Sequence, residues 1–149
     1  MASRVYNAAL KAIVDGTIDL NSSDIRAALL MTNTTADTDN DADVFVGDLT
    51  TLDECDATGY ARQALASEAV NIDDTNDRAE FDATDVSFTG LSGNATRAIQ
   101  GVLLYKHVTN DADSPLLAFI DFTSDIPATA TQIDIPWNAE GILQIAQAA

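Results

Sequence analysis

The chain has 149 residues, of which 24 are acidic and seven are basic, so its formal net charge is −17. This charge opposes binding to nucleic acids, whose phosphates attract Lys and Arg, and it also opposes docking on anionic membranes. Apolar residues make up 46% of the chain, enough for a globular fold, and no run of ~18 or more apolar residues predicts a membrane span. We therefore expect one domain, residues 1–149, without nucleic-acid or membrane partners.

Residues 1–15 are predicted to form a short N-terminal helix or docking arm. Tyr6, Leu10 and Ile13 recur at helical spacing with alanines between them, and an Asp-Gly pair ends the pattern. The segment has no long apolar block, so we do not expect a secretory signal. Val5, Tyr6 and Leu10 are the candidate contacts of this arm with a neighbouring protein.

Alternating apolar residues then predict a series of β-strands. Residues 25–31 place apolar side chains on one face of a strand. Gly59 is expected to open a long strand that runs through residues 70–72. Its expected neighbour is the run 78–88, with the polar residues 73–77 as the hairpin turn. Between the first two strands, the polar stretch 49–56 is a candidate helical turn.

The clearest hairpin joins residues 98–108 to residues 116–122. Both runs are almost continuously apolar, which is typical of central strands covered on both faces. Two short strands follow near the C-terminus, on either side of residues 138–141. The total of about eight strands separated by polar turns predicts a mainly β, two-sheet antiparallel β-sandwich of the jelly-roll or Greek-key kind.

An acidic loop, residues 32–43, is the first candidate for a metal site. Four aspartates alternate there and a fifth stands at the twelfth place, as hard oxygen ligands do in an EF-hand calcium loop. They are Asp37, Asp39, Asp41, Asp43 and Asp48. Ala42 replaces the turn glycine, and Asp48 replaces the bidentate Glu, so an EF-hand is not expected. A Ca²⁺ site of another kind and a flexible solvated loop remain the two alternatives, because four close carboxylates repel one another without a cation.

Few residues offer enzyme chemistry, so we expect a non-enzymatic protein without other cofactors. His107 and Cys55 are the only residues of their types, which rules out the usual zinc sites and leaves one candidate base for a catalytic triad. Residues 90–93 lack nucleophile-elbow spacing. Trp137 follows a proline, and its alternatives are a sugar-stacking or partner-anchoring aromatic and a core residue at a strand end.

The order of segments resembles a widespread group of small tailed-bacteriophage virion proteins, which are similar to capsid decoration (cement) proteins. The segments that carry the resemblance are GTIDL (16–20), DIRAALL (24–30), GYARQAL (59–65), FDATDVSF (81–88), IQGVLLY (99–105), LAFIDF (117–122) and IPWNAEGIL (135–143). They cover nearly the whole chain and are structural patterns, so the resemblance implies a β-sandwich and no active site. The acidic insert at 36–43 stands apart from the pattern.

The resemblance implies a protein on the outer surface of a virion, bound to the major capsid protein or another virion protein and stabilising the shell. We expect homo-oligomers, as is common for proteins that sit around symmetry axes. The alternatives are a tail or fibre-base component and a calcium- or carbohydrate-binding adhesion module. A chain of charge −17 has no advantage inside a DNA-filled shell, which agrees with an outer position.

Overall fold

The structure is a computed structural model, which describes residues 3–38, 42–92 and 94–146. It is mainly β, with 39% of residues in strands and 8% in helices, as the sequence predicts. Its strands form three antiparallel sheets, of five, three and two strands. The α-helix of the described chain, α1 (Asn7–Val14), has eight residues, and no described helix has the length and apolar character needed to cross a membrane.

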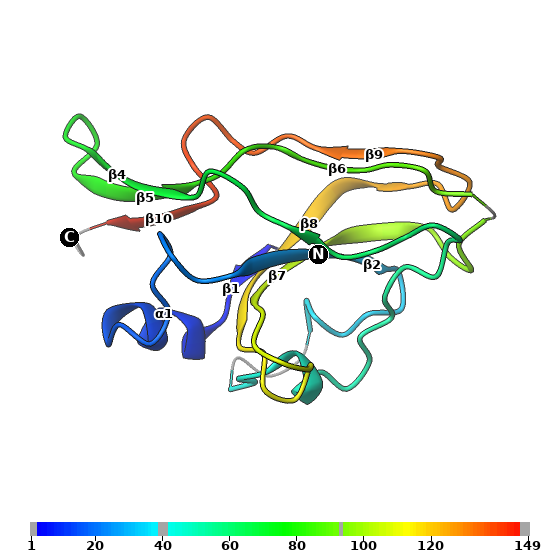
Figure 1. The fold of residues 1–149 in the computed structure, drawn as a ribbon, viewed down its shortest axis with the longest axis horizontal. Helices are drawn as coiled ribbons and strands as arrows, with labels where there is room; N and C mark the ends of the chain where they lie inside the picture. The colour runs from blue at the N-terminus through cyan, green and yellow to red at the C-terminus, as the bar shows by residue number, and fades with distance from the viewer. Residues whose placement is uncertain (1–2, 39–41, 93, 147–149) are drawn as a thin grey trace.

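The five-stranded main sheet forms the centre of the molecule (Figure 1). In spatial order it consists of β1 (Arg4–Val5), β8 (Leu116–Ile126), β7 (Ile99–Lys106), β2 (Ile25–Met31) and β3 (Gln63–Ala64). Seven consecutive residues of β7 are buried, which confirms the prediction of a central strand covered on both faces. Gly101 of β7 is needed for this packing, since a Cβ there would lie 2.6 Å from the Phe119 ring and 2.4 Å from the Ile120 carbonyl oxygen.

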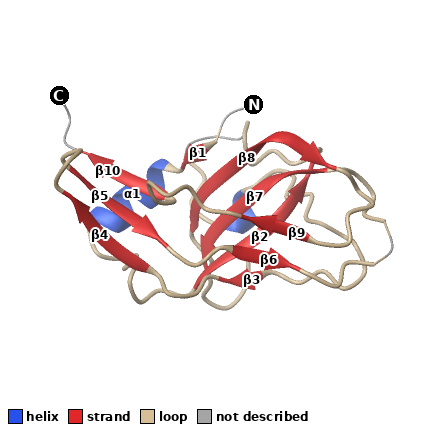
Figure 2. Ribbon diagram, turned by 90° about the horizontal axis from the view of Figure 1, so that it is seen from above, coloured by secondary structure: helices blue, strands red, loops and turns tan. Residues whose placement is uncertain are grey.

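The two smaller sheets together form a second layer. One consists of β10 (Leu143–Ala146), β5 (Arg78–Asp82) and β4 (Ala69–Asp73), and the other of β6 (Val86–Phe88) and β9 (Ile133–Ile135). Since β6 follows β5 and β10 follows β9, the two antiparallel pairs continue each other along the layer. The β6–β9 pair lies over the main sheet, whereas the three-stranded sheet extends beyond it (Figures 1 and 2). We call this three-stranded sheet the wing.

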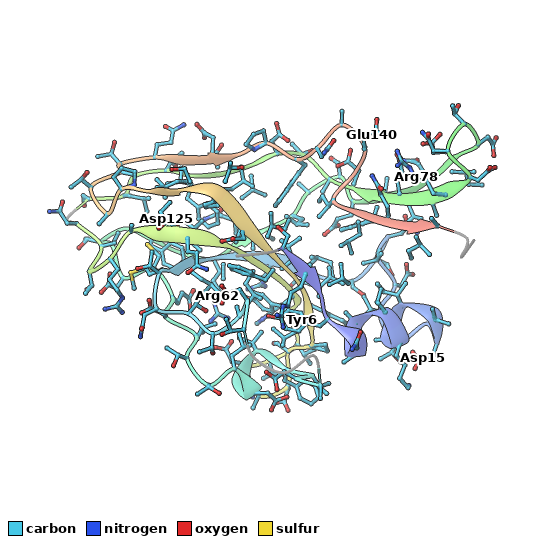
Figure 3. All side chains as sticks on the ribbon, turned by 180° about the vertical axis from the view of Figure 1, so that it is seen from behind. Tyr6, Asp15, Arg62, Arg78, Asp125 and Glu140 are labelled. Carbon is cyan, nitrogen blue, oxygen red and sulfur yellow. The ribbon has the colours of Figure 1, made fainter. Side chains whose placement is uncertain are left out.

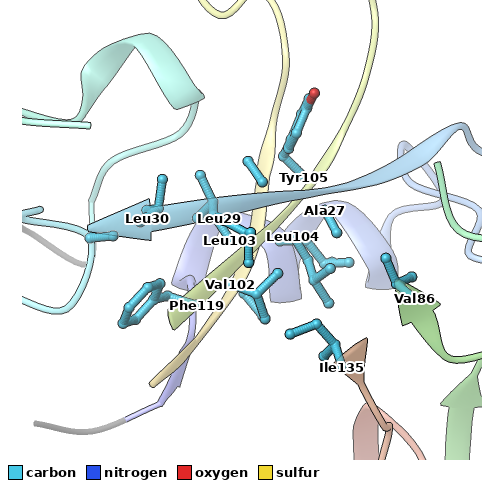
Figure 4. Close-up of a cluster of buried hydrophobic side chains, with 14 of the residues drawn as sticks. Ala27, Leu29, Leu30, Val86, Val102, Leu103, Leu104, Tyr105, Phe119 and Ile135 are labelled. Carbon is cyan, nitrogen blue, oxygen red and sulfur yellow. The ribbon is translucent and has the colours of Figure 1, made fainter. Parts of the chain in front are cut away.

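The core fills the space on both faces of the main sheet. On one face, Val86 and Ile135 of the second layer point toward Val102 and Leu104 of β7 (Figure 4). On the opposite face lie α1 and the loop residues 32–38 and 42–50 (Figure 1). Alanine-rich α1 can approach the sheet closely because Ala9 is small and buried. The buried apolar residues form one continuous cluster.

Several predicted elements differ in their bounds and partners. The long strand expected from residue 59 to residue 72 is wrong: the chain forms β3, turns at Ser67, whose φ is +58°, and starts again as β4 in another sheet. The run 78–88 likewise divides into β5 and β6, although the hairpin turn at 73–77 is confirmed. The predicted helical turn lies earlier, as the 3₁₀ helix η1 (Val46–Asp48). Two sheets were expected, and the second layer is in fact split into two.

Candidate functional site

All seven basic side chains of the chain bind acceptors within the molecule. The pairs are Arg4 with the Asp37 carbonyl, Lys11 with Asp15, Arg26 with Asp24, Arg62 with Glu54 and Asp111, Arg78 with Asp73, Glu80 and Glu140, Arg97 with Asp53, and Lys106 with the Thr17 carbonyl. Because the acids outnumber the bases by 24 to seven, the surface that the chain presents to a partner is negative overall. Such a surface favours basic partners and disfavours nucleic acids.

Arg62 occupies a partly buried ion-pair network. Its guanidinium binds Glu54 at 2.6 Å and Asp111 at 2.6 Å, and lies 5.1 Å from the centre of the Tyr105 ring. The hydroxyl of Tyr60 donates to Glu54 at 2.8 Å. These carboxylates raise the pKa of Arg62, and Arg62 in turn holds the pKa of Asp111 below its usual value. The network ties the 54–62 loop to the β7–β8 connection, which contains Asp111, so its role is structural. Figure 3 marks the position of Arg62.

A second cluster lies on the outward face of the wing. Oxygen atoms of Asp73, Glu80 and Glu140 come within 4.8 Å of one another, and this is the group of three acidic side chains that converges in the described part of the chain. Arg78 lies among them and binds all three, with Asp73 at 3.1 Å and Glu80 at 2.8 Å (Figure 3). The Arg78 guanidinium offsets one of the three negative charges and donates to all three carboxylates, so the cluster is held together by an ion-pair network.

The structure places three of the five aspartates predicted to bind calcium. Asp37 is 7% exposed and accepts a hydrogen bond at 3.0 Å from Nε2 of Gln100, on β7. Asp48 accepts from the backbone N–H groups of residues 44 and 45 at 3.1 and 2.9 Å. Asp43 is half-buried. Asp39 and Asp41 lie outside the described residues. None of these three aspartates belongs to the acidic group that converges among the described residues, and the calcium site stays a prediction.

The predicted docking residues of the N-terminal arm have unequal access to a partner. Tyr6 is 0% exposed, and its hydroxyl donates at 2.8 Å to the carbonyl of Ala36 (Figure 3). Tyr6 therefore belongs to the core, because the arm folds back as β1 and α1 against β8. The prediction that Tyr6 contacts a neighbouring protein is wrong. Val5 is half-buried opposite Ala118 in the β1–β8 pair. Leu10 is 44% exposed and remains accessible.

Trp137 connects the two sheets of the second layer at the point where that layer is interrupted. Its ring Nε1 donates to the Thr84 carbonyl at 3.0 Å, and its backbone N–H donates to Asp85 Oδ1 at 2.9 Å. These bonds join the segment between β5 and β6 to the segment between β9 and β10. The half-buried ring therefore serves packing at a strand end, one of the two predicted roles.

The same ring also lines a surface groove of about 600 Å³, between β8 and the segment after β9. One wall of the groove is formed by an irregular part of β8. Asp121 pairs with Gly101 and Ile126 pairs with Ile99, so β8 has more residues than β7 between these two pairs and bulges there. The other lining side chains relevant to ligand chemistry are Phe122, Ile142, Asp134 and Asn138. An aromatic face beside carboxylate and amide groups has the composition of a small-ligand site.

The two residues with nucleophile or base chemistry lie apart from this groove. Cys55 is 5% exposed, and burial raises the pKa of its thiol, the opposite of what a reactive thiolate needs. His107 packs edge-on against Tyr105, with ring centres 6.4 Å apart. Neither residue lines the groove around Trp137.

The feature that sequence reasoning missed is an uncovered apolar face on the wing. Cross-strand pairing places Val70, Phe81 and Leu143 in one row, and Ile72, Ala79 and Ile145 in the next. In the first row Phe81 and Leu143 are buried, and Leu20 from the loop after α1 packs beside them. In the second row Ile72 is 81% exposed and Ile145 is 44% exposed. The alternation in both strands was visible in the sequence, but the absence of a covering layer was not.

Comparison of the chain with protein-family models, with curated proteins and with solved structures finds no match.

Proposed function

We propose that this chain is a non-enzymatic structural protein of a tailed-bacteriophage particle, a decoration protein that binds the outer surface of the capsid and stabilises it. The observation that carries the proposal is the combination of an acidic exterior, in which every cation is bound internally, with an apolar sheet face left uncovered. Such a surface suits attachment to a protein neighbour. The resemblance of the sequence segments to virion proteins supports the further proposal that this neighbour is the major capsid protein or another virion protein.

The mainly β architecture also supports this proposal. Its pairing leaves short strands at the edges: among the described residues, β1 pairs with Ala118 and Phe119 of the long strand β8, and Tyr6 and Ser3 bind the backbone of Leu117 and Asp121 beside them. The remaining outer edge of β8 and the wing offer backbone and apolar groups to neighbours. We further propose that the protein forms homo-oligomers on the shell, as symmetric surface proteins do.

The experiment is to purify native phage particles from the source of the chain and to image them by electron microscopy after labelling with antibody against the chain. A decoration protein gives label at regular positions over the shell, and shells stripped of it lose resistance to heat or chelators. Label confined to the tail assigns the chain to the tail or fibre base instead. Absence of the chain from particles, tested by mass spectrometry, refutes both assignments.

One observation favours a second function, a carbohydrate-binding adhesion module. The groove beside Trp137 combines aromatic and carboxylate groups in about 600 Å³. Titration with mono- and disaccharides, followed by Trp137 fluorescence, tests it, since Trp137 is the only tryptophan of the chain. A saturable change with a sugar supports the adhesion module, and its absence at millimolar sugar counts against it. Titration with Ca²⁺ by calorimetry tests the acidic loop in the same way.

A further inference from the structure

The uncovered face of the wing concentrates exposed aliphatic side chains. The described chain has seven large apolar residues that are strongly exposed, and Val70, Ile72 and Ile145 are three of them. All three lie on one face of the wing, because β4, β5 and β10 are aligned residue by residue. Isolated exposed aliphatics need no explanation, but a cluster on one sheet face marks an interaction surface.

The surroundings of this face are acidic. Ile72 and Ile145 line a shallow depression of about 390 Å³ together with Asp73, Asp74 and Asp77. Asp74 and Asp77 are exposed in the β4–β5 turn. Arg78 also lines the depression, but its guanidinium is bound by Asp73, Glu80 and Glu140. The aliphatic centre is therefore bordered by carboxylates, without a cation left to offset them.

This charge distribution discriminates between the candidates for the occupant. A second copy docked by the same face would bring the β4–β5 carboxylates of both copies into one interface, and like charges brought together cost free energy. A partner with Lys or Arg around an aliphatic centre would instead pair with Asp74 and Asp77 while covering Ile72 and Ile145. The charge of −17 would also speed the encounter with such a partner.

We propose that the apolar face of the wing, formed by Val70, Ile72, Ala79 and Ile145, docks a protein surface in which basic residues surround an aliphatic centre. The identification of that protein as a virion protein rests on the proposed function. The docking face itself and the chemistry of its partner are independent of the proposed function. The self-association proposed above then uses another face of the molecule.

The first test uses a short labelled peptide of alternating lysine and valine, with fluorescence anisotropy as the readout. A polycationic peptide is attracted to any acidic protein, so binding by wild type alone is not informative. The informative measurement is the comparison of two matched variants. Ile72→Asp and Val108→Asp change the net charge equally at two exposed positions, 81% and 51% exposed. We expect Ile72→Asp to weaken binding about tenfold or more and Val108→Asp about twofold or less. Equal effects would mean general electrostatic attraction and would overturn the proposal.

Two further measurements make the outcome specific. Ile72→Thr keeps β-propensity and charge, and it too should weaken the lysine–valine peptide, whereas a lysine–serine peptide should bind wild type and variant alike. Sedimentation velocity tests whether a second copy of the chain occupies the face instead. If wild type is a dimer and Ile72→Asp dissociates it, the occupant is a second copy and the proposal is overturned. Circular dichroism checks that each variant remains folded.

A shell-binding assay separates failure of this inference from failure of the proposed function. If wild type and Ile72→Asp bind capsid shells equally, the decoration function stands and the docking face is wrong. If the wing binds the lysine–valine peptide specifically but wild type does not bind shells or tails, the docking face stands and the virion function fails.

Discussion

The main sheet and the wing use the same alternation of apolar side chains with opposite outcomes. In the main sheet, Leu103 and Leu104 point to opposite faces and both are fully buried, because a layer lies on each side. In the wing, Val70 and Ile72 are on the same face, yet both remain exposed because the covering material ends near Leu20. The difference shows that strand pattern determines which face is apolar, while the layers around the strand determine whether that face is core or contact surface.

The sharpest test of this comparison is an equal truncation in the two regions. Leu103→Ala on β7 removes buried methyl groups and leaves a cavity, so we expect it to lower the free energy of unfolding by about 3 kcal/mol. Ile72→Ala on β4 should lower it by less than about 0.5 kcal/mol, because that side chain is 81% exposed. Urea denaturation followed by circular dichroism measures both. Similar losses would show that the wing face is covered in solution.

A second test compares a partly buried ion-pair network with a more exposed pair. Arg62→Met leaves Glu54 and Asp111 close together without their shared cation, so we expect a loss of about 2 kcal/mol in the free energy of unfolding. Arg26→Met is the control: its pair with Asp24 is 34% and 42% exposed, and such pairs contribute about 0.5 kcal/mol or less. The two variants have the same charge, so the difference between them isolates the network. Equal losses of unfolding free energy in the two variants would show that the Arg62 network stabilises the fold no more than an exposed ion pair does.

The pH dependence of the same network follows from the lowered pKa of Asp111. A carboxylate whose pKa is lower in the folded than in the unfolded chain stabilises fully above the unfolded value, about 3.9, and less as the pH falls through the folded value. The stability difference between wild type and Arg62→Met should therefore be constant near neutral pH and shrink below about pH 4. Comparing the two proteins cancels the general effect of protonating the other acids. A difference that stays constant down to pH 2 would contradict the prediction.

Local patterns in the sequence predicted the elements better than their partners. The β2 strand and the β7–β8 and β4–β5 hairpins were predictable because apolar alternation and polar turns are properties of short segments. The split of the 59–72 run was not, because it depends on Ser67 adopting a positive φ and on the chain leaving one sheet for another. Likewise, β9 and β10 were predicted as strands, but their pairing with β6 and β5 is a long-range choice.

The candidate site was harder to predict for the same reason. Tyrosine is a residue type that often anchors protein contacts, yet the fold buries Tyr6 and directs its hydroxyl to the carbonyl of Ala36 in the core. The exposure of Ile72 depends on distant segments that no local pattern encodes, and so do the ion pairs Arg62–Asp111, Arg78–Glu140 and Arg97–Asp53. The net charge could be read from the composition alone, because internal ion pairs do not change its sum.

The smallest expected effect concerns Trp137, at the junction between the wing and the β6–β9 pair. Trp137→Phe retains an aromatic ring but removes the hydrogen bond from Nε1 to the Thr84 carbonyl. We expect a loss of about 1 kcal/mol in the free energy of unfolding, the usual net contribution of one hydrogen bond. Amide hydrogen exchange should show where the loss is felt. If Trp137 joins the two parts of the second layer, exchange should quicken in β9 and β10 and stay unchanged in β7, whereas uniform quickening would mean that the bond stabilises the whole fold without joining those parts.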